Sequence, residues 1–277
     1  MGDSWIIDNL VNALNTWNSK FQEIWALLTT SPQNFKGGTI WTVIKNIHGT
    51  LQAIALALLV IFFVCGVVKT CGSFTEVKKL EHVLKLFVRF AIAKGVVTYG
   101  LDLLLAIMEI AQGTITSVMN TTGVASYSKI VLPEVIKNAC NDVGWLEAMP
   151  LYAVTLIGSL FITILSFIMI LTVYGRFFKI YLYTAISPLP LSTFAGQPFQ
   201  SMGINFLKSF SGVCLEGLII VISCVIFSAF VVSPTVNADA SASSMLWGYI
   251  SEIIFNLLVL VGTVKMSDRI IKELMGL

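Results

Sequence analysis

Three long runs of this chain contain no charged side chain. Residues 46–68, 148–175 and 180–207 hold 23, 28 and 28 consecutive residues without Asp, Glu, Lys or Arg. A helix that crosses a bilayer needs about 20 mainly apolar residues. Over the whole chain, 56% of the residues are hydrophobic and only 12% are charged, about half the charge of an ordinary soluble domain. These features predict an all-α, polytopic membrane protein.

The hydrophobic pattern predicts about five transmembrane helices. Two further apolar stretches, at 90–119 and 203–232, are interrupted by ionisable residues. A last stretch, at 244–264, carries Glu252. We therefore expect residues 46–277 to form a transmembrane helical domain. An odd number of spans places the two termini on opposite sides of the membrane. The predicted spans are 46–68, 90–119, 148–175, 203–232 and 244–264.

The distribution of basic residues predicts the orientation of these spans. If the N-terminus is outside the cell, 12 of the 17 Lys and Arg residues fall on the cytoplasmic side and five fall outside. Short cytoplasmic loops of membrane proteins carry the excess of Lys and Arg. The count therefore favours a multi-pass protein of the cytoplasmic membrane with its N-terminus outside and its C-terminus in the cytoplasm.

Residues 1–45 have a different character from the rest of the chain. Apolar side chains recur at helical spacing between Ile7 and Leu28, and polar side chains rich in Asn take the opposite face. The pattern predicts an extracytoplasmic or interfacial amphipathic helix followed by a linker. This helix could lie in the outer leaflet, against a partner subunit, or on its own helix bundle, and the sequence leaves these alternatives open.

Three prolines interrupt the charge-free run at 180–207. A proline in a helix interior costs roughly 3 kcal/mol, and it disfavours helical geometry at the residue before it. We therefore expect a rigid, non-helical elbow on the cytoplasmic side between the third and fourth spans. A plain apolar turn is the simpler alternative, and a re-entrant or pore-rim element is another. The elbow residues are Ser187, Pro188, Pro190 and Pro198.

Ionisable residues inside predicted spans are candidates for a polar lumen or interface. Such a group costs roughly 2.5–3.5 kcal/mol at mid-membrane, so it should face protein or water. Asp102 and Glu109 are seven residues apart and share one helix face. An acidic lining for a conduit or a proton path is one interpretation; a position near a span end, or pairing with lysine, is the other. The candidates are Asp102, Glu109, Glu216, Glu252, Lys94 and Lys208.

No sequence motif points to an enzyme. The chain has no Walker motif, nucleophile elbow, HExxH pair or redox cysteine pair. Its five cysteines and two histidines show no metal-ligand spacing. We therefore predict no catalytic residue, no metal site and no cofactor.

Two stretches of the sequence resemble a known family. They are "GRFFKIYLYTAISPLPLSTFAG" at 175–196 and "FLKSFSGVCLEGLIIVISCVIF" at 206–227. These residues resemble the TrbL-like polytopic membrane subunits of conjugative type IV secretion systems, particularly the short form found in Gram-positive bacteria. The likeness is densest over residues 176–227.

The resemblance implies a non-enzymatic channel or scaffold subunit with an extracytoplasmic N-terminus and about five spans. It also implies a homo-oligomeric ring in the cytoplasmic membrane that contacts a translocating DNA–protein substrate only transiently. The implied partners are the secretion ATPases, the coupling protein and other membrane subunits of the apparatus. A small-solute transporter or ion channel is the alternative function, and a purely structural scaffold is a third.

Overall fold

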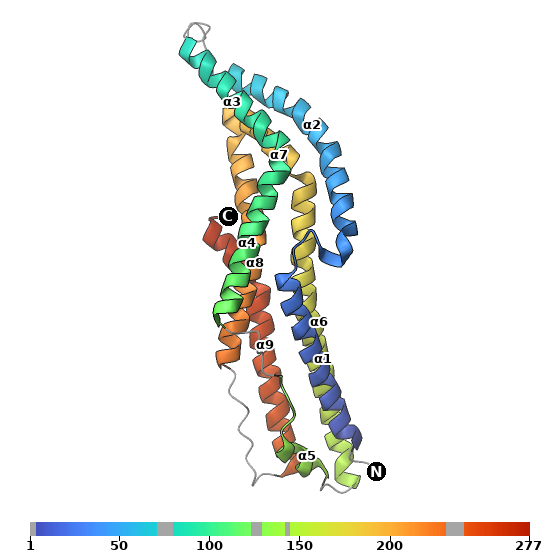
Figure 1. Cartoon of the computed structure of the whole chain (residues 1–277). Helices are drawn as coiled ribbons and strands as arrows, with labels where there is room; N and C mark the ends of the chain where they lie inside the picture. The colour runs from blue at the N-terminus through green and yellow to red at the C-terminus, as the bar shows by residue number, and fades with distance from the viewer. Residues whose placement is uncertain (1–3, 71–79, 123–128, 142–144, 231–240) are drawn as a thin grey trace. The chain divides into compact units, whose positions relative to one another are not determined.

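The computed structural model describes residues 4–70, 80–122, 129–141, 145–230 and 241–277, and this part of the chain contains helices and no strands (Figure 1). The prediction of an all-α membrane protein is confirmed. Five helical segments are long and apolar enough to cross a membrane, as expected. They are Phe35–Lys69, Gly100–Thr121, Ala148–Ile186, Gln197–Ala229 and Ser243–Met275.

The described elements follow one another along the chain in a simple order. The first half contains α1 (Ser4–Thr29), the short 3-10 helix η1 (Phe35–Gly38), α2 (Thr39–Thr70), α3 (Leu80–Thr98), α4 (Gly100–Thr122) and α5 (Glu134–Asn141). The second half contains α6 (Trp145–Ile186), α7 (Pro188–Ser192), η2 (Thr193–Ala195), η3 (Gln197–Phe199), α8 (Gln200–Phe230) and α9 (Ala242–Met275).

The second candidate span begins about ten residues later than the sequence predicts. A turn at Tyr99 separates α3 from α4, and the apolar segment starts at Gly100. Helical hydrogen bonds continue across this turn, from Tyr99 N–H to the Gly95 carbonyl (2.8 Å) and from Leu103 N–H to the Tyr99 carbonyl (3.1 Å). Lys94 therefore belongs to α3 and lies outside the span.

The helices pack into two compact units, which are described separately. Unit 1 comprises Met1–Thr29, Thr116–Tyr174 and Leu218–Ser267. Unit 2 comprises Thr30–Ile115, Gly175–Gly217 and Asp268–Leu277.

In unit 1, the amphipathic helix α1 packs its apolar face against its own chain. Trp17 and Phe21 are each 1% exposed, and the Tyr174 hydroxyl on α6 donates a 2.9 Å hydrogen bond to Glu23 Oε1 on α1. The Asn18 amide exchanges two hydrogen bonds with the backbone of Ile130, at 2.9 and 3.1 Å. Of the alternatives that the sequence left open, the structure supports packing on its own bundle.

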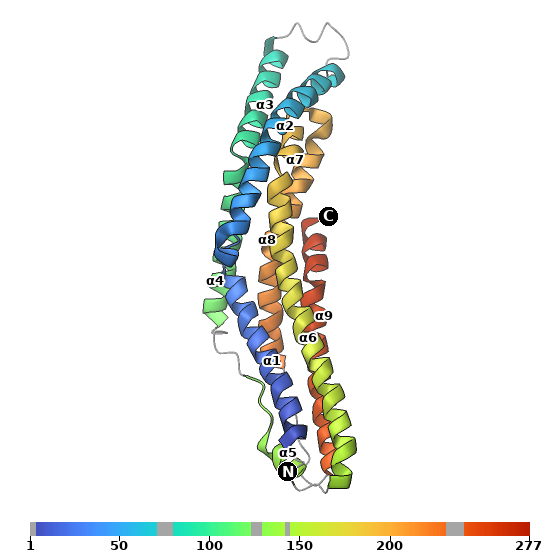
Figure 2. The same cartoon turned by 90° about the vertical axis from the view of Figure 1, so that its right-hand side faces the viewer.

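In unit 2, α2 and α3 lie side by side and both contact α7 (Figures 1 and 2). The Gln52 amide on α2 donates hydrogen bonds to the carbonyls of Val97 (3.0 Å) and Thr98 (2.9 Å). Both carbonyls lie at the end of α3, next to the turn at Tyr99. The side chain thereby fixes the end of α3 to α2.

The proline-rich elbow is helical, so the expectation of a non-helical segment is wrong. Ser187 has φ −52° and ψ −35°, although a proline follows it, and Pro188 and Pro190 lie inside the short helix α7. Pro198 lies in the 3-10 helix η3, and the backbone is extended at Gly196 (φ −105°, ψ 123°). The prolines sit within the first turn of α7 or η3, where an N–H group has no intrahelical partner to lose.

Side-chain hydroxyls donate additional hydrogen bonds to backbone carbonyls in and just before the elbow. Ser187 Oγ donates to the Thr184 carbonyl (2.9 Å), which the absent N–H of Pro188 would otherwise reach. The hydroxyl of Ser192 donates to the Leu189 carbonyl (2.6 Å). Thr193 Oγ1 donates to the Pro190 carbonyl (2.7 Å). The break between α6 and α8 is therefore an ordered structure with its own hydrogen bonds.

The elbow also packs very closely against α2. A Cβ atom built on Gly66 would lie 2.9 Å from Gly196 Cα, and one built on Gly196 would lie 2.5 Å from the Phe62 carbonyl oxygen. The rings of Phe62 and Phe199 are 5.1 Å apart. Because both glycines lack side chains, the two backbones can meet directly.

Candidate functional site

Lys179 connects three helices of unit 2 through charged contacts. Its Nζ on α6 lies 3.3 Å from Glu216 Oε2 on α8 and 2.8 Å from Asp268 Oδ1 on α9. The second oxygen of Asp268 lies 2.8 Å from Lys272 Nζ. Together with Arg176, these residues form what we call the Lys179 cluster. It ties together the third, fourth and fifth candidate spans.

The Lys179 cluster runs from a buried end to an exposed end. The side chain of Glu216 is 2% exposed, whereas those of Asp268, Lys179 and Lys272 are 30%, 39% and 56% exposed. Burying a charged carboxylate is costly unless an opposite charge and hydrogen bonds accompany it. Lys179 supplies both to Glu216, so it is the central residue of the cluster.

Arg176 lies one turn before Lys179 on α6 and is 2% exposed. Its guanidinium carbon is 5.4 Å from the Phe177 ring centre, and its Nε and Nη1 atoms have no hydrogen-bond partner among the described residues. A Cβ atom on Gly217 would collide with Nη1, so the arginine occupies the space that this glycine leaves on α8. The buried positive charge attracts the nearby Glu216 carboxylate.

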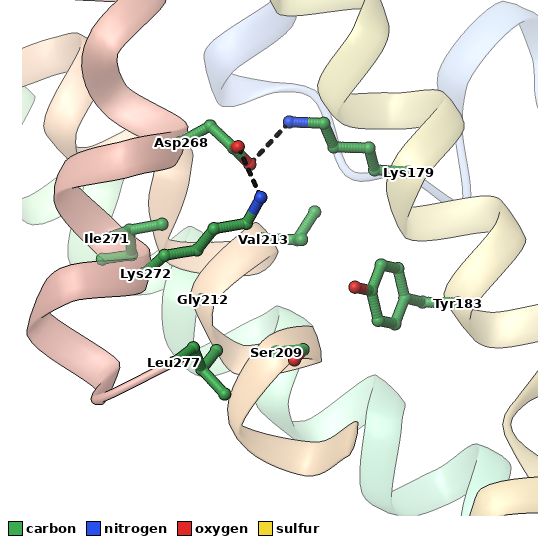
Figure 3. Close-up of a pocket in the computed structure, with 9 residues that line it drawn as sticks. All are labelled: Lys179, Tyr183, Ser209, Gly212, Val213, Asp268, Ile271, Lys272 and Leu277. Atoms are coloured by element: carbon green, nitrogen blue, oxygen red, sulfur yellow. Dashed lines mark hydrogen bonds and ion pairs between the residues drawn. The ribbon is translucent and has the colours of Figure 1, made fainter. Parts of the chain in front are cut away.

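A pocket of about 170 Å³ opens beside the exposed end of the cluster (Figure 3). Its polar residues come from α6, α8 and α9, and its remaining surface is apolar. In Figure 3 the Tyr183 hydroxyl points toward the middle of the pocket. The lining residues are Lys179, Tyr183, Ser209, Gly212, Val213, Asp268, Ile271, Lys272 and Leu277.

The structure brings one of the six predicted polar residues into this cluster, namely Glu216. The other five are exposed, and none forms an ion pair or hydrogen bond with another described residue. Among the acidic candidates, Glu216 therefore pairs with a lysine, Lys179, whereas the other three have no such partner in the described part of a single copy. These five residues are Asp102, Glu109, Glu252, Lys94 and Lys208.

Asp102 and Glu109 nevertheless share one exposed face of α4, as their spacing predicts. Asp102 lies in the first turn of α4, close to the end of the candidate span. Glu109 lies nine residues after Gly100, which at 1.5 Å per residue is roughly 14 Å into the span. Since the hydrocarbon core is about 30 Å thick, Glu109 sits near its middle.

The elbow residues differ in their accessibility. Ser187 is buried, and so is Pro188, whereas Pro190 is partly exposed and Pro198 is exposed. A partner could therefore reach the end of the elbow near Pro198, but not its start.

Most of the Lys179 cluster was missed by reasoning from the sequence. Arg176, Lys179 and Tyr183 recur at helical spacing, which places them on one face of α6, and Asp268 and Lys272 are one turn apart on α9. This spacing is a detectable signal, but it does not tell which helices meet. The arrangement can hold charges at a helix junction; among the described residues no group of three or more His, Cys, Asp or Glu side chains could hold a metal ion.

Comparison with protein-family models identifies a family for this chain. A protein-family model described as "TrbL/VirB6 plasmid conjugal transfer like protein" matches residues 17–188. The match covers more than half of the chain and includes the first part of the stretch at 176–227 on which the sequence resemblance was based. No curated protein and no solved structure matches the chain.

Proposed function

The chain belongs to the TrbL/VirB6 family of plasmid conjugal transfer proteins, and we propose that it assembles with copies of itself into part of the substrate translocation path. Family membership and the five apolar helices make it a multi-pass membrane subunit of a bacterial conjugal transfer system. The proposed role is that of a non-enzymatic channel or scaffold subunit. Its proposed partners are the secretion ATPases and the coupling protein.

The position of Glu109 is the observation that supports this proposal most. Its side chain is exposed near the middle of a candidate span and has no ion-pair partner among the described residues. An ionisable group facing lipid at this depth costs roughly 2.5–3.5 kcal/mol. A water-filled lumen or a neighbouring copy removes this cost, because either one provides a polar environment. Self-association therefore accounts for an exposed carboxylate that a single copy in lipid does not.

A lumen lined by carboxylates also suits the proposed substrate. Fixed negative charges repel DNA phosphates, so a passing strand does not adhere to the wall. Leu103 and Ile110 form an apolar stripe next to the acidic stripe of Asp102 and Glu109, and both stripes are exposed. The two stripes of α4 thus offer one face for water and one for lipid or a neighbouring copy.

A cysteine at position 109 is expected to react with a water-soluble thiol reagent in cells that carry the transfer apparatus. Glu109→Cys should react at least tenfold faster than Ile110→Cys. The reagent reacts with the thiolate, and at a position that faces lipid the apolar surroundings keep the thiol protonated. The measurement is the labelling rate in a background from which the native cysteines have been removed. Equal rates at the two positions, or a strictly monomeric mass in nanodiscs, would contradict the proposed conduit. Ion flux through the purified protein, with normal conjugal transfer in a deletion strain, would instead favour an ion channel.

We also propose that the N-terminus lies outside the cell and the C-terminus in the cytoplasm. The asymmetry of Lys and Arg supports this orientation. On intact cells, Lys129→Cys should be labelled by a membrane-impermeant thiol reagent, whereas Lys85→Cys should need permeabilised cells. Native Cys140 is a poor reporter, because it is 1% exposed and burial raises the pKa of its thiol. The reverse labelling pattern would overturn the orientation.

The elbow is the proposed contact with the cytoplasmic ATPases. In the proposed orientation it lies on the cytoplasmic side, between the third and fourth spans. Since Ser187 and Pro188 are buried, the contact surface is limited to the exposed end that contains Gln197 and Pro198.

A further inference from the structure

The pocket beside the Lys179 cluster has more hydrogen-bond donors than acceptors. Lys272 Nζ has three N–H groups and uses one for Asp268, and both oxygens of Asp268 already accept bonds from lysine. The hydroxyls of Tyr183 and Ser209 make no hydrogen bond with another described residue. A ligand that fits this pocket must therefore bring acceptors.

The charge around the pocket also favours a ligand that carries hydrogen-bond acceptors, because it is net positive. The charged side chains that line the pocket are two lysines, Lys179 and Lys272, and one carboxylate, Asp268, which leaves one net positive charge. These charges favour an anionic ligand over a neutral or cationic one.

The positions of the lining residues along the candidate spans indicate how deep in the membrane the pocket lies. Lys179 lies seven residues before the end of the third candidate span, Ser209 twelve residues after the start of the fourth, and Lys272 three residues before the end of the fifth. These helices have 33 to 39 residues, more than the roughly 20 that cross the hydrocarbon core, so all three positions can lie near its edge. Successive spans alternate in direction, so these three ends share one side of the membrane. Lysines at the ends of membrane helices place their ammonium groups at headgroup level.

The remaining walls of the pocket are apolar. They are formed by Val213, Ile271, Leu277 and the ring of Tyr183, which lie beside the ammonium groups (Figure 3). A polar end and an apolar wall within one cavity suit a ligand that is itself anionic at one end and hydrocarbon at the other.

We propose that this pocket binds a phosphate ester with a hydrocarbon chain, such as the headgroup region of an anionic phospholipid. The phosphate oxygens accept hydrogen bonds from Lys179, Lys272, Tyr183 and Ser209, and the start of the chain lies against Ile271. The site would link the third, fourth and fifth spans to the lipid on the side where they meet. It is independent of the proposed role in DNA transfer, because it requires only the monomer's own residues.

The test measures lipid retained by the full-length protein. The chain is placed in nanodiscs of phosphatidylglycerol or phosphatidylcholine, and bound lipid is counted by native mass spectrometry after release. We expect preferential retention of phosphatidylglycerol, with affinity roughly tenfold lower in Lys272→Met because a charge-assisted hydrogen bond is lost. Arg269→Met is the matched control: it removes one positive charge on α9, three residues from Lys272, at a residue whose side chain is 78% exposed and does not line the pocket. Its retention should stay within about twofold of the unaltered protein.

A second variant keeps the test decisive if Lys272→Met is unstable. Tyr183→Phe combined with Ser209→Ala removes two donors and leaves every ion pair of the cluster in place, so it should fold and retain less phosphatidylglycerol. Inorganic phosphate at millimolar concentration distinguishes recognition of a free phosphate from recognition of a phospholipid. If it displaces the lipid, the pocket recognises the phosphate group alone. If it does not, the pocket recognises the phosphate together with the hydrocarbon chain. Equal retention of the two lipids, or unchanged retention in the double variant, overturns the proposal.

Discussion

Replacing Lys179 with methionine is expected to destabilise the protein by about 2–3 kcal/mol. The substitution keeps the length and the apolar stem of the side chain but removes the charge that Glu216 and Asp268 share. Losing one partner of a buried ion pair typically costs about 3–5 kcal/mol, and we place the loss below this range because Lys179 is 39% exposed and therefore partly screened. The measurement is the free energy of unfolding in mixed detergent micelles.

A second substitution separates charge from packing. In the Lys179→Met background, Glu216→Gln removes the buried negative charge that lost its partner, and it should recover about half of the lost stability. Lys265→Met, at an exposed position on α9, is the control and should change the stability by no more than about 0.5 kcal/mol. If the two substitutions in the cluster are simply additive, the ion pair does not stabilise the helix junction and the cluster loses its structural role.

Replacing Gly196 with alanine is expected to separate the elbow from α2. The added Cβ would lie 2.5 Å from the Phe62 carbonyl oxygen and 2.9 Å from the Phe199 ring, so a backbone must shift. Overpacking of this kind costs about 1–3 kcal/mol. We expect a lower melting temperature in detergent and, if the elbow contacts the energising ATPases, a parallel fall in conjugal transfer.

Gly95→Ala on α3 is the matched control for this substitution. A Cβ at Gly95 meets nothing within 4 Å, and alanine favours a helix over glycine by about 1 kcal/mol. This variant should therefore be as stable as the unaltered protein or slightly more stable. A stable Gly196→Ala protein with normal transfer would show that the close contact between α2 and the elbow is dispensable.

The number and approximate position of the spans could be predicted because charge-free runs leave a chain few other options. Residues 148–175 have no charge, and the structure places a long helix there. The start of the second span could not be predicted, because the helical hydrogen bonds that continue across Tyr99 join α3, which carries several charged residues among its apolar ones, to the more apolar α4. A hydropathy average taken over a window of residues does not resolve the boundary between two helices that are joined in this way.

The elbow and the Lys179 cluster show what sequence reasoning lacks. Proline rules describe a helix interior, but Pro188 lies at the start of a short helix, where its missing N–H costs little. The partner of Glu216 lies 37 residues away, on a helix whose rotation is set by packing. Local spacing could place Lys179 on a face of α6, but it could not say that this face meets α8 and α9.

The hydroxyl bonds within the elbow have a consequence for where this segment can reside. Backbone carbonyls that depend on water must stay at the membrane surface, because in hydrocarbon each unsatisfied group costs several kcal/mol. The carbonyls of Thr184, Leu189 and Pro190 accept hydrogen bonds from side chains of the same segment instead. For these three carbonyls a hydrogen bond from water is no longer required, so the bend between α6 and α8 can pack directly against α2 and α3 without water in between.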